Sequence, residues 1–459
     1  MDKYLGNKSS LLPILSSYIR ARAPRARSLS DPFTGTTNVA RHFRARGWDI
    51  TVADVNRFSH TLANTYIGRQ DELAFRDVPF RSRLVNTKPL KDTFDAAAAR
   101  LQPMFISAGL AEIWHGLQQG ARALAILQAI GETNLKPGFI FQYYTRFGEH
   151  SHFRSLRGRQ GKRNYFSGEN ALFIDGVLAS IRRWWRAGLL TRDELDFLMT
   201  SVIEEVVITA NVSGTFHDFN RDRLWPNAMQ RFTLRVPISE RRDSAATIIN
   251  ADAITSSGSY PLHDVSYLDP PYNFRQYTAY YHFLNFIAAY PHLASIKRYV
   301  QGLVHVRGQN MDDDYTSDFS FRDRFIDSLR LLIERVPARH VFLSYYGGRN
   351  HWNHWAEVET PGNEGFLRLR ELFEDRRLFS RHEVTSALEI RKNFQSRVGE
   401  QKSLVNEYLF YGQKRATLPT AKSPAIIPTN ENLGIAEAFC PIVRRSLVKE
   451  AGDEIGVGA

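Results

Sequence analysis

The stretch DPFTGTT at residues 31–37 decides how the first part of this 459-residue chain is interpreted. A helical pattern over 39–46 follows it, and then an alternating apolar segment, 50–54, typical of a strand that ends in an acid. Strand, turn, helix and strand in this order form the front half of a Rossmann-like unit. The sequence therefore predicts an α/β fold for residues 1 to about 75.

Outward from this unit the pattern changes and then returns. Residues 76–242 read as mostly helical, with a long helical stretch at 96–130 and an antiparallel helix pair over 170–209 that turns near Gly188. The α/β pattern resumes at about 247, with strands expected before Asp252 and at 265–268, 340–345, 382–389 and 407–411. The last two strands have no convincing helix between them, so we predict an antiparallel hairpin that closes the sheet.

These patterns predict a mostly helical insertion, 76–242, inside an α/β core made of residues 1–75 and 243–415. The remaining residues, 416–459, are first rich in Pro, Thr and Ala and then polar, which indicates a loosely attached tail.

A second short stretch carries chemistry. An apolar run, 265–268, is followed by the catalytic candidates Asp269, Pro270, Pro271 and Tyr272. A carboxylate and a backbone carbonyl at a strand's end can accept both hydrogens of an exocyclic amine, whose lone pair is otherwise delocalised into its ring. Pro270 lacks an N–H, and two proline rings stiffen the turn so that its carbonyls point outward. Tyr272 offers a flat face for stacking a base. The alternative is structural, because Pro-Pro pairs often only end a strand and Asp often only caps a turn.

The composition of the chain limits which binding partners and which kinds of site are expected. The formal net charge of +12 favours a polyanionic partner, most simply nucleic acid. The single cysteine, Cys440, excludes an intramolecular disulfide framework and a multi-cysteine metal site, so we expect no metal and a reducing, cytoplasmic setting. This cysteine falls in the expected tail, which argues against chemistry that needs a cysteine nucleophile, such as methylation of cytosine at C5. No apolar run typical of a signal peptide or a membrane span is evident.

Five motifs now stand in a recognisable order: YLGNK at 4–8, DPFTGT at 31–36, DVN at 54–56, NAD at 250–252 and DPPYN at 269–273. This order resembles the alpha group (Dam-like) of adenine-specific DNA methyltransferases over roughly residues 1–412. That family places a target-recognition domain between a cofactor-binding half and a catalytic half. The resemblance therefore implies that 76–242 is the target-recognition insertion, 1–75 the cofactor-binding half and 243–415 the catalytic half.

The resemblance also implies S-adenosylmethionine as cofactor. Asp54 would accept hydrogen bonds from the ribose hydroxyls, and Asp252 would face the cofactor's adenine or its amine. Asp269 and the Pro270 carbonyl would hold the target amine. The cofactor-binding residues carried over from the motifs are Tyr4, Gly6, Lys8, Asp31, Phe33, Gly35, Asp54, Asn56 and Asp252.

One residue departs from the family pattern. The family's turn often reads Gly-x-Gly, and residue 37 here is Thr37. A β-branched residue cannot easily adopt a positive φ. Either the turn keeps Thr37 at negative φ, which we expect, or cofactor affinity is weakened.

A basic segment, 153–163, lies inside the insertion and holds five basic residues and no acidic one. We expect it to contact the DNA backbone, with Arg side chains able to pair with guanine edges in the major groove. A solvated loop is the alternative. The DNA-binding candidates are Arg154, Arg157, Arg159, Lys162, Arg163 and, directly after the catalytic motif, Arg275.

Together these features predict a site-specific DNA adenine-N6 methyltransferase that acts on a flipped-out base in double-stranded DNA. The usual use of the family adds a restriction-modification role with a possible cognate endonuclease. Methylation of cytosine N4, an RNA base or a protein glutamine stays open, although within the family Asp at 269 favours adenine. A non-catalytic DNA-binding relative with a decayed cofactor site is the alternative from another class.

Overall fold

The computed structural model of the chain describes residues 7–69, 71–79, 86–105, 109–154, 158, 160–240, 246–300, 303, 307–310, 313–347, 350–352, 364–392 and 404–415. Several candidates from the sequence lie outside the described residues, namely Tyr4, Gly6, Arg157, Arg159 and the expected tail with Cys440.

The centre of the fold is a seven-stranded sheet with the order β5-β2-β1-β6-β7-β9-β8. The first five strands in this order run parallel, whereas β9 is antiparallel to both of its neighbours. The expected α/β fold and its closing antiparallel hairpin are therefore confirmed. The strands are β1 (Ser28–Asp31), β2 (Asp49–Ala53), β5 (Ala246–Ile249), β6 (His263–Leu268), β7 (Ala338–Tyr346), β8 (Phe379–Lys392) and β9 (Leu404–Lys414).

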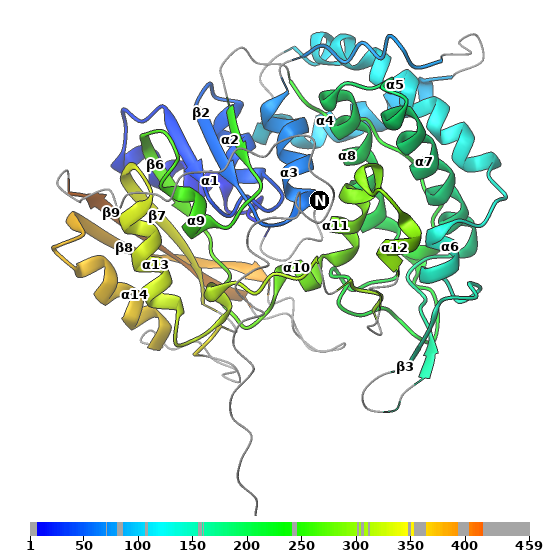
Figure 1. Ribbon diagram of the computed structural model, residues 1–459. Coiled ribbons are helices and arrows are strands. Elements are labelled where there is room, and N and C mark those ends of the chain that lie inside the picture. Colours follow the sequence, from blue (N-terminus) through cyan, green and yellow to red (C-terminus); the bar gives the residue numbers. More distant parts are fainter. Residues whose placement is uncertain are drawn as a thin grey trace, which may run out of the picture.

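Helices cover both faces of this sheet (Figure 1). Side chains alternate between two cores along β7, where Phe342 packs into the first core and Val341 and Leu343 into the second. The first core includes α1 (Leu12–Arg22), α2 (Asn38–Arg44) and α3 (Arg57–Ala63). The second includes α9 (Ala253–Ser257), α13 (Phe325–Arg335) and α14 (Glu364–Glu374). The result is the three-layer arrangement that a mostly parallel sheet requires.

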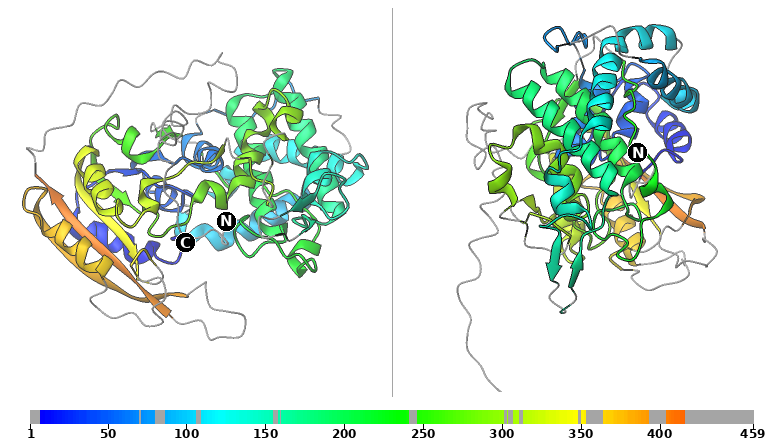
Figure 2. Two further views of the ribbon diagram at one scale, coloured as in Figure 1. Left: turned by 60° about the horizontal axis from the view of Figure 1, so that its bottom comes forward. Right: turned by 90° about the vertical axis from the view of Figure 1, so that its right-hand side faces the viewer.

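The insertion forms a helical body beside the sheet (Figures 1 and 2). The expected helix pair is present as α7 and α8, joined through Gly188 at φ +69°. A capping box between Thr191 and Glu194 starts α8. The long helical stretch expected at 96–130 is two helices, α4 and α5. The helices of this part are α4 (Lys88–Phe105), α5 (Leu110–Thr133), α6 (Phe139–Tyr144), α7 (Gly168–Arg186) and α8 (Arg192–Thr209).

Short elements complete the chain between these bodies. A two-stranded hairpin, β3 (His152–Arg154) with β4 (Gln160–Lys162), extends from the helical body (Figure 2, right). A π-helix follows α3 (Asn64–Gly68), and 3₁₀ turns occur at Pro226–Met229, Tyr290–His292 and Asp318–Ser320. Three further helices follow β6, namely α10 (Tyr277–Tyr280), α11 (His282–Ala289) and α12 (Ile296–Val300).

Helix α11 joins the two bodies. Its Phe283 lies in a stack with Tyr165 and Phe216 of the insertion, with ring centroids 6.3 Å and 5.2 Å away. This helix lies within the expected catalytic half, 243–415, and packs against the insertion, so that one apolar core continues from the sheet into the insertion. The division of the chain at 75 and 242 stays a prediction. None of the helices in the described part of the chain has the length and hydropathy to span a bilayer.

Candidate active site

The acids picked out from the sequence come together at one edge of the sheet. Asp31 ends β1, and Asp54, Asp252 and Asp269 follow β2, β5 and β6. Because these strands are parallel, their carboxyl ends lie at the same edge. The chain runs outward in opposite directions from the neighbouring strands β1 and β6, which makes this point the topological switch where open α/β sheets bind ligands.

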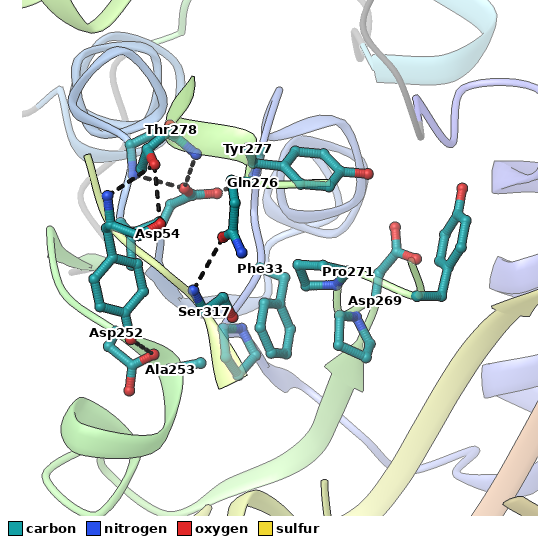
Figure 3. A pocket seen from close by; sticks show the side chains of 17 residues that line it. Phe33, Asp54, Asp252, Ala253, Asp269, Pro271, Gln276, Tyr277, Thr278 and Ser317 are labelled. Atoms are coloured by element: carbon teal, nitrogen blue, oxygen red, sulfur yellow. Dashed lines mark hydrogen bonds between the residues drawn. The ribbon is translucent and has the colours of Figure 1, made fainter. Parts of the chain in front are cut away.

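A pocket that is partly open to solvent lies at this switch point. Asp252 and Asp269 lie on opposite sides of it with Phe33 between them (Figure 3). The expected site residues that line it are Phe33, Gly35, Asp54, Asn56, Asp252, Asp269, Pro270, Pro271 and Tyr272. Sequence reasoning missed Pro32, Val55, Ala253, Gln276, Tyr277, Thr278, Tyr315 and Ser317, which also line the pocket. Their proximity to the motifs in sequence was a signal for most of them, but not for Tyr315 and Ser317.

Asp54 organises the loops after β1 and β2. Its Oδ2 accepts a hydrogen bond of 2.8 Å from the backbone N–H of Gly35, which has φ +48°. Its Oδ1 accepts from the backbone N–H and the side-chain amide of Asn56, at 2.8 Å and 2.9 Å. Burial raises the pKa of Asp54, and the bonds from Asn56 and Gly35 counteract part of that increase. The carboxylate therefore holds both loops in place at the pocket.

The Asn56 side chain links this corner to the helical body. Its Oδ1 accepts from the Asn285 amide at 2.9 Å, and the Asn285 Oδ1 accepts from the backbone N–H of Phe58 at 3.3 Å. Since Asn285 belongs to α11, the loop after β2 is tied directly to the helix that joins the two bodies.

Thr37 adopts a left-handed conformation at φ +64° and ψ 6°. Our expectation of a negative φ was therefore wrong, and the turn keeps the backbone geometry of a glycine. The residue is fully buried, its carbonyl accepts from the Arg41 N–H at 2.8 Å, and its Oγ1 has no hydrogen-bond partner among the described residues. Positive φ at a β-branched residue is strained, and the surrounding contacts at the start of α2 hold it.

Asp31 lies beneath the site rather than in its lining. It is 2% exposed, and its Oδ1 accepts from the Phe33 N–H at 3.3 Å. Burial, together with the negative charge of nearby Asp269, raises the pKa of Asp31 to about 8. Asp31 therefore holds a proton more readily than an ordinary aspartate, which limits the negative charge concentrated next to Asp269.

Asp269 is bound to a buried lysine. The Lys8 ammonium lies 2.9 Å from its Oδ1 and 2.5 Å from Oε1 of Glu407 on β9. A cofactor contact for Lys8 stays a prediction, since Lys8 is not among the residues that line the pocket. Sequence reasoning missed Glu407, and a charged residue directly before the apolar strand pattern YLFY was the only signal.

Tyr272 is supported by a second layer of rings. Its ring centroid lies 5.3 Å from that of Tyr346 and 6.4 Å from that of Tyr345, both on β7. Its carbonyl accepts from the His351 N–H at 3.0 Å. The ring is 9% exposed and lines the pocket, so it is held firmly from one side.

A segment around Tyr315 lines the pocket on the side of Asp252. The Tyr315 hydroxyl donates to Oδ2 of Asp252 at 2.8 Å, and its backbone N–H donates to the Thr278 hydroxyl at 3.0 Å. Asp252 also caps α9, accepting from the N–H groups of Ile254 and Thr255 at 3.0 Å each. This segment thus fixes the side of the pocket opposite Asp269.

The DNA-contact candidates fall in different environments. Arg154 is exposed and Lys162 half-buried, at the two ends of the β3–β4 hairpin. Arg163 is 4% exposed, and its guanidinium donates to the carbonyls of Tyr143 and His150 at 3.4 Å and 3.3 Å. Arg275 is half-buried beside the catalytic motif.

Comparison with known proteins agrees with this geometry. The sequence matches the description of the D12 class N6 adenine-specific DNA methyltransferases over residues 4–96 and 161–312, which together make up more than half of the chain. The chain belongs to this family of enzymes. The unmatched stretch between the two segments holds the second half of α4, all of α5 and α6, and β3.

Curated relatives are similar over long stretches. The modification methylase LlaI of Lactococcus lactis subsp. lactis is 25% identical over 92% of this chain and 56% of its own length. The type II methyltransferase M.NlaIII of Neisseria lactamica is 24% identical over 81% of this chain and 87% of its own. The type II methyltransferase M.FokI of Planomicrobium okeanokoites is 27% identical over 56% of this chain and 36% of its own. The chain thus spans about half of the LlaI methylase and most of the NlaIII methylase.

Proposed function

We propose that this protein is a site-specific DNA methyltransferase that methylates N6 of an adenine flipped out of double-stranded DNA. One observation supports it above the others. The motif from Asp269 to Tyr272 lines the same pocket as Phe33, Gly35 and Asp54. Asp269, which can accept a hydrogen bond from the target amine, and Asp54, which can accept hydrogen bonds from a ribose, therefore face one cavity.

The lining of the pocket fits S-adenosylmethionine in its chemistry. Pro32 and Phe33 give it an apolar wall, and Asp54 occupies the strand end where acids bind ribose hydroxyls in dinucleotide folds. Gly35 lets the backbone come close to the ligand. When bound there, S-adenosylmethionine supplies an electrophilic methyl group.

The catalytic residues position the amine. Asp269 and the carbonyl of Pro270 accept hydrogen bonds from its two N–H groups, which directs nitrogen lone-pair density toward the methyl donor. Tyr272 stacks the base and offsets part of the cost of flipping it, about a few kcal/mol. No covalent bond to the protein is required, so most of the catalysis is positioning.

The insertion serves recognition in this proposal. The β3–β4 hairpin brings Arg154 and Lys162 to the phosphate backbone, and Arg275 contacts DNA next to the catalytic motif. Arg157 and Arg159, which lie outside the described residues, stay candidates from the sequence alone. Arg163 is left out of the interface, because its guanidinium is bonded to carbonyls inside the insertion.

The biological role proposed is protection of DNA in a restriction-modification system. The similar proteins carry the names modification methylase and type II methyltransferase. A cognate endonuclease would then share the recognition sequence, and the enzyme would act on cytoplasmic DNA.

Expression in a methylation-deficient bacterial host tests the proposal. Genomic DNA is then read by a sequencing method that reports N6-methyladenine, with Asp269→Ala as the inactive control. We expect one short sequence motif to be methylated by the natural protein and none by the variant. Unmodified DNA from well-expressed, cofactor-binding protein would contradict the proposal and favour RNA or protein as substrate, and N4-methylcytosine would change the target base.

A further inference from the structure

Glu407 is a buried carboxylate behind the pocket that takes no direct part in holding the amine or the cofactor. It lies on β9, opposite Tyr346 of β7 and Ala387 of β8, and is fully buried in the sheet. A buried carboxylate is costly unless it is paired. Its Oε1 lies 2.5 Å from the Lys8 ammonium, which is itself 4% exposed.

A buried ion pair of this kind is a poor source of stability. Apolar residues of similar size often stabilise a fold as well or better, because desolvation offsets the Coulomb attraction. The pair joins two residues that are 399 positions apart in the sequence, and it lies next to Asp269 of the catalytic motif. The location indicates a role in the site rather than in folding.

Lys8 links Glu407 to Asp269, because its ammonium group contacts both carboxylates. The same ammonium lies 2.9 Å from Oδ1 of Asp269, so Glu407 and Asp269 hold it from two directions. The contact with Glu407 has hydrogen-bond geometry, whereas the contact with Asp269 is an ion pair, so Lys8 attracts the Asp269 carboxylate through charge. A nearby cation also favours the ionised form of a carboxyl group, which is the form that accepts hydrogens from an amine.

We propose that Glu407 is a positioning residue for methyl transfer, which acts by holding Lys8 against Asp269. This inference rests on the proposed role of Asp269 as acceptor for the target amine. Glu407 itself touches neither substrate nor cofactor. Its effect is to fix the orientation of the Asp269 carboxylate and to keep that carboxylate ionised.

The titratable groups around Asp269 make the pH dependence informative. Asp31 and Tyr267 lie within electrostatic range of it, in addition to Lys8 and, through Lys8, Glu407. If Glu407 acts through Lys8, its removal releases the ammonium from Asp269, and Asp269 takes up a proton at higher pH. If Glu407 acts directly as a like charge, its removal favours ionisation of Asp269 and has the opposite sign.

The experiment compares Glu407→Gln, Lys8→Met and the double variant in steady-state methylation of DNA that carries the recognition motif. We expect Glu407→Gln to lower kcat on the order of 10- to 100-fold, as small displacements of catalytic groups do. The acid limb of its pH–rate profile should move to higher pH, and its calorimetric Kd for S-adenosylmethionine should change little. The double variant should be no slower than Lys8→Met alone, because both substitutions break one chain of contacts.

Glu383→Gln is the matched control. Glu383 lies on β8 of the same hairpin and pairs with Arg22 of α1, away from Lys8, so its kcat should stay at the natural value. Glu407→Asp keeps the charge with a shorter reach and should recover part of the kcat that Glu407→Gln loses. It also tests the proposal if Glu407→Gln does not fold.

Three outcomes would overturn this inference: natural kcat in folded Glu407→Gln, an acid limb displaced to lower pH, or strictly additive effects on kcat in the double variant. Failure of the proposed function is a different result. In that case the natural protein itself leaves adenine unmodified, whatever the variants do.

Discussion

The pocket at the sheet edge and the β3–β4 hairpin hold their functional side chains in opposite ways. In the pocket, Asp54 is 9% exposed and accepts three hydrogen bonds, and Asp252 likewise accepts three. On the hairpin, Arg154 is exposed to solvent on a three-residue strand. Chemistry needs groups held to fractions of an ångström, whereas attraction to phosphates needs mainly charge within reach. Substitutions in the pocket should therefore alter catalysis or cofactor binding, and substitutions on the hairpin should alter DNA affinity and its salt dependence.

The strongest test of this contrast is Asp269→Ala. We expect kcat to fall on the order of 10³-fold, as when a preorganised hydrogen-bonding group is removed from an active site. The Kd for S-adenosylmethionine, measured by calorimetry, should stay within about 3-fold, because Asp269 is assigned to the amine and not to the cofactor. Asp264→Asn, at the opposite end of the same strand, is the control and should stay active. Substantial activity in Asp269→Ala would refute the mechanism.

Asp54→Asn tests the other side of the pocket. Hydrogen bonds to a charged group contribute about 1.5–3 kcal/mol, so the Kd for S-adenosylmethionine should rise roughly 10- to 100-fold. Saturating cofactor should restore most of kcat. Asp49→Asn alters the exposed first residue of the same strand and should leave the Kd unchanged. An unaltered Kd in Asp54→Asn would remove this acid from the cofactor site.

Two substitutions of Tyr272 distinguish the contribution of its ring face from that of its hydroxyl. Tyr272→Ala should lower kcat/KM on the order of 10- to 100-fold, since stacking a base on an aromatic side chain contributes about 1–3 kcal/mol. Tyr272→Phe should stay within about 3-fold of the natural enzyme, because the stacking face is kept. Steady-state kinetics on one DNA duplex compares the two. Equal decreases in both variants would argue against stacking.

Hairpin substitutions should behave differently from all of these. Arg154→Gln with Lys162→Gln should weaken binding of specific and non-specific duplexes alike. The slope of log K against log salt should shrink by about 0.9 for each phosphate that the variant no longer neutralises. Fluorescence anisotropy at several salt concentrations measures both effects. Arg339→Gln, in β7 near its amino end and away from the site, is the control for loss of a positive charge elsewhere on the protein. An unchanged slope would place the hairpin outside the interface.

The smallest expected effect concerns Thr37→Gly. Glycine relieves the strain of φ +64°, which costs about 1–2 kcal/mol at a non-glycine residue. Glycine also loses more conformational entropy on folding, which lowers the free energy of unfolding by about 0.5–1 kcal/mol. The free energy of unfolding should therefore rise by about 1 kcal/mol or less in urea titrations. The cofactor Kd should change less than about 3-fold, since the backbone already has the glycine geometry. A many-fold gain in affinity would mean that Thr37 handicaps the natural site.

Short-range patterns determined a large part of this protein from sequence. Strand and helix periodicity gave the α/β core, the helix pair around Gly188 and the closing hairpin, because side-chain burial repeats with the period of each element. The motif acids Asp54, Asp252 and Asp269 were identified because each lies at or shortly after the end of a strand, and parallel strands bring such residues to one edge.

Only the tertiary structure decided the rest, because it depends on segments distant in sequence. Thr37 takes a positive φ since the surrounding fold outweighs its local preference. Tyr315 donates to Asp252, which lies 63 residues earlier in the chain, and Glu407 meets Lys8 from the far end of the chain. Periodicity shows whether a side chain faces inward, but not which partner lies opposite. Those partners are set by the tertiary packing of segments distant in sequence, which no local pattern encodes.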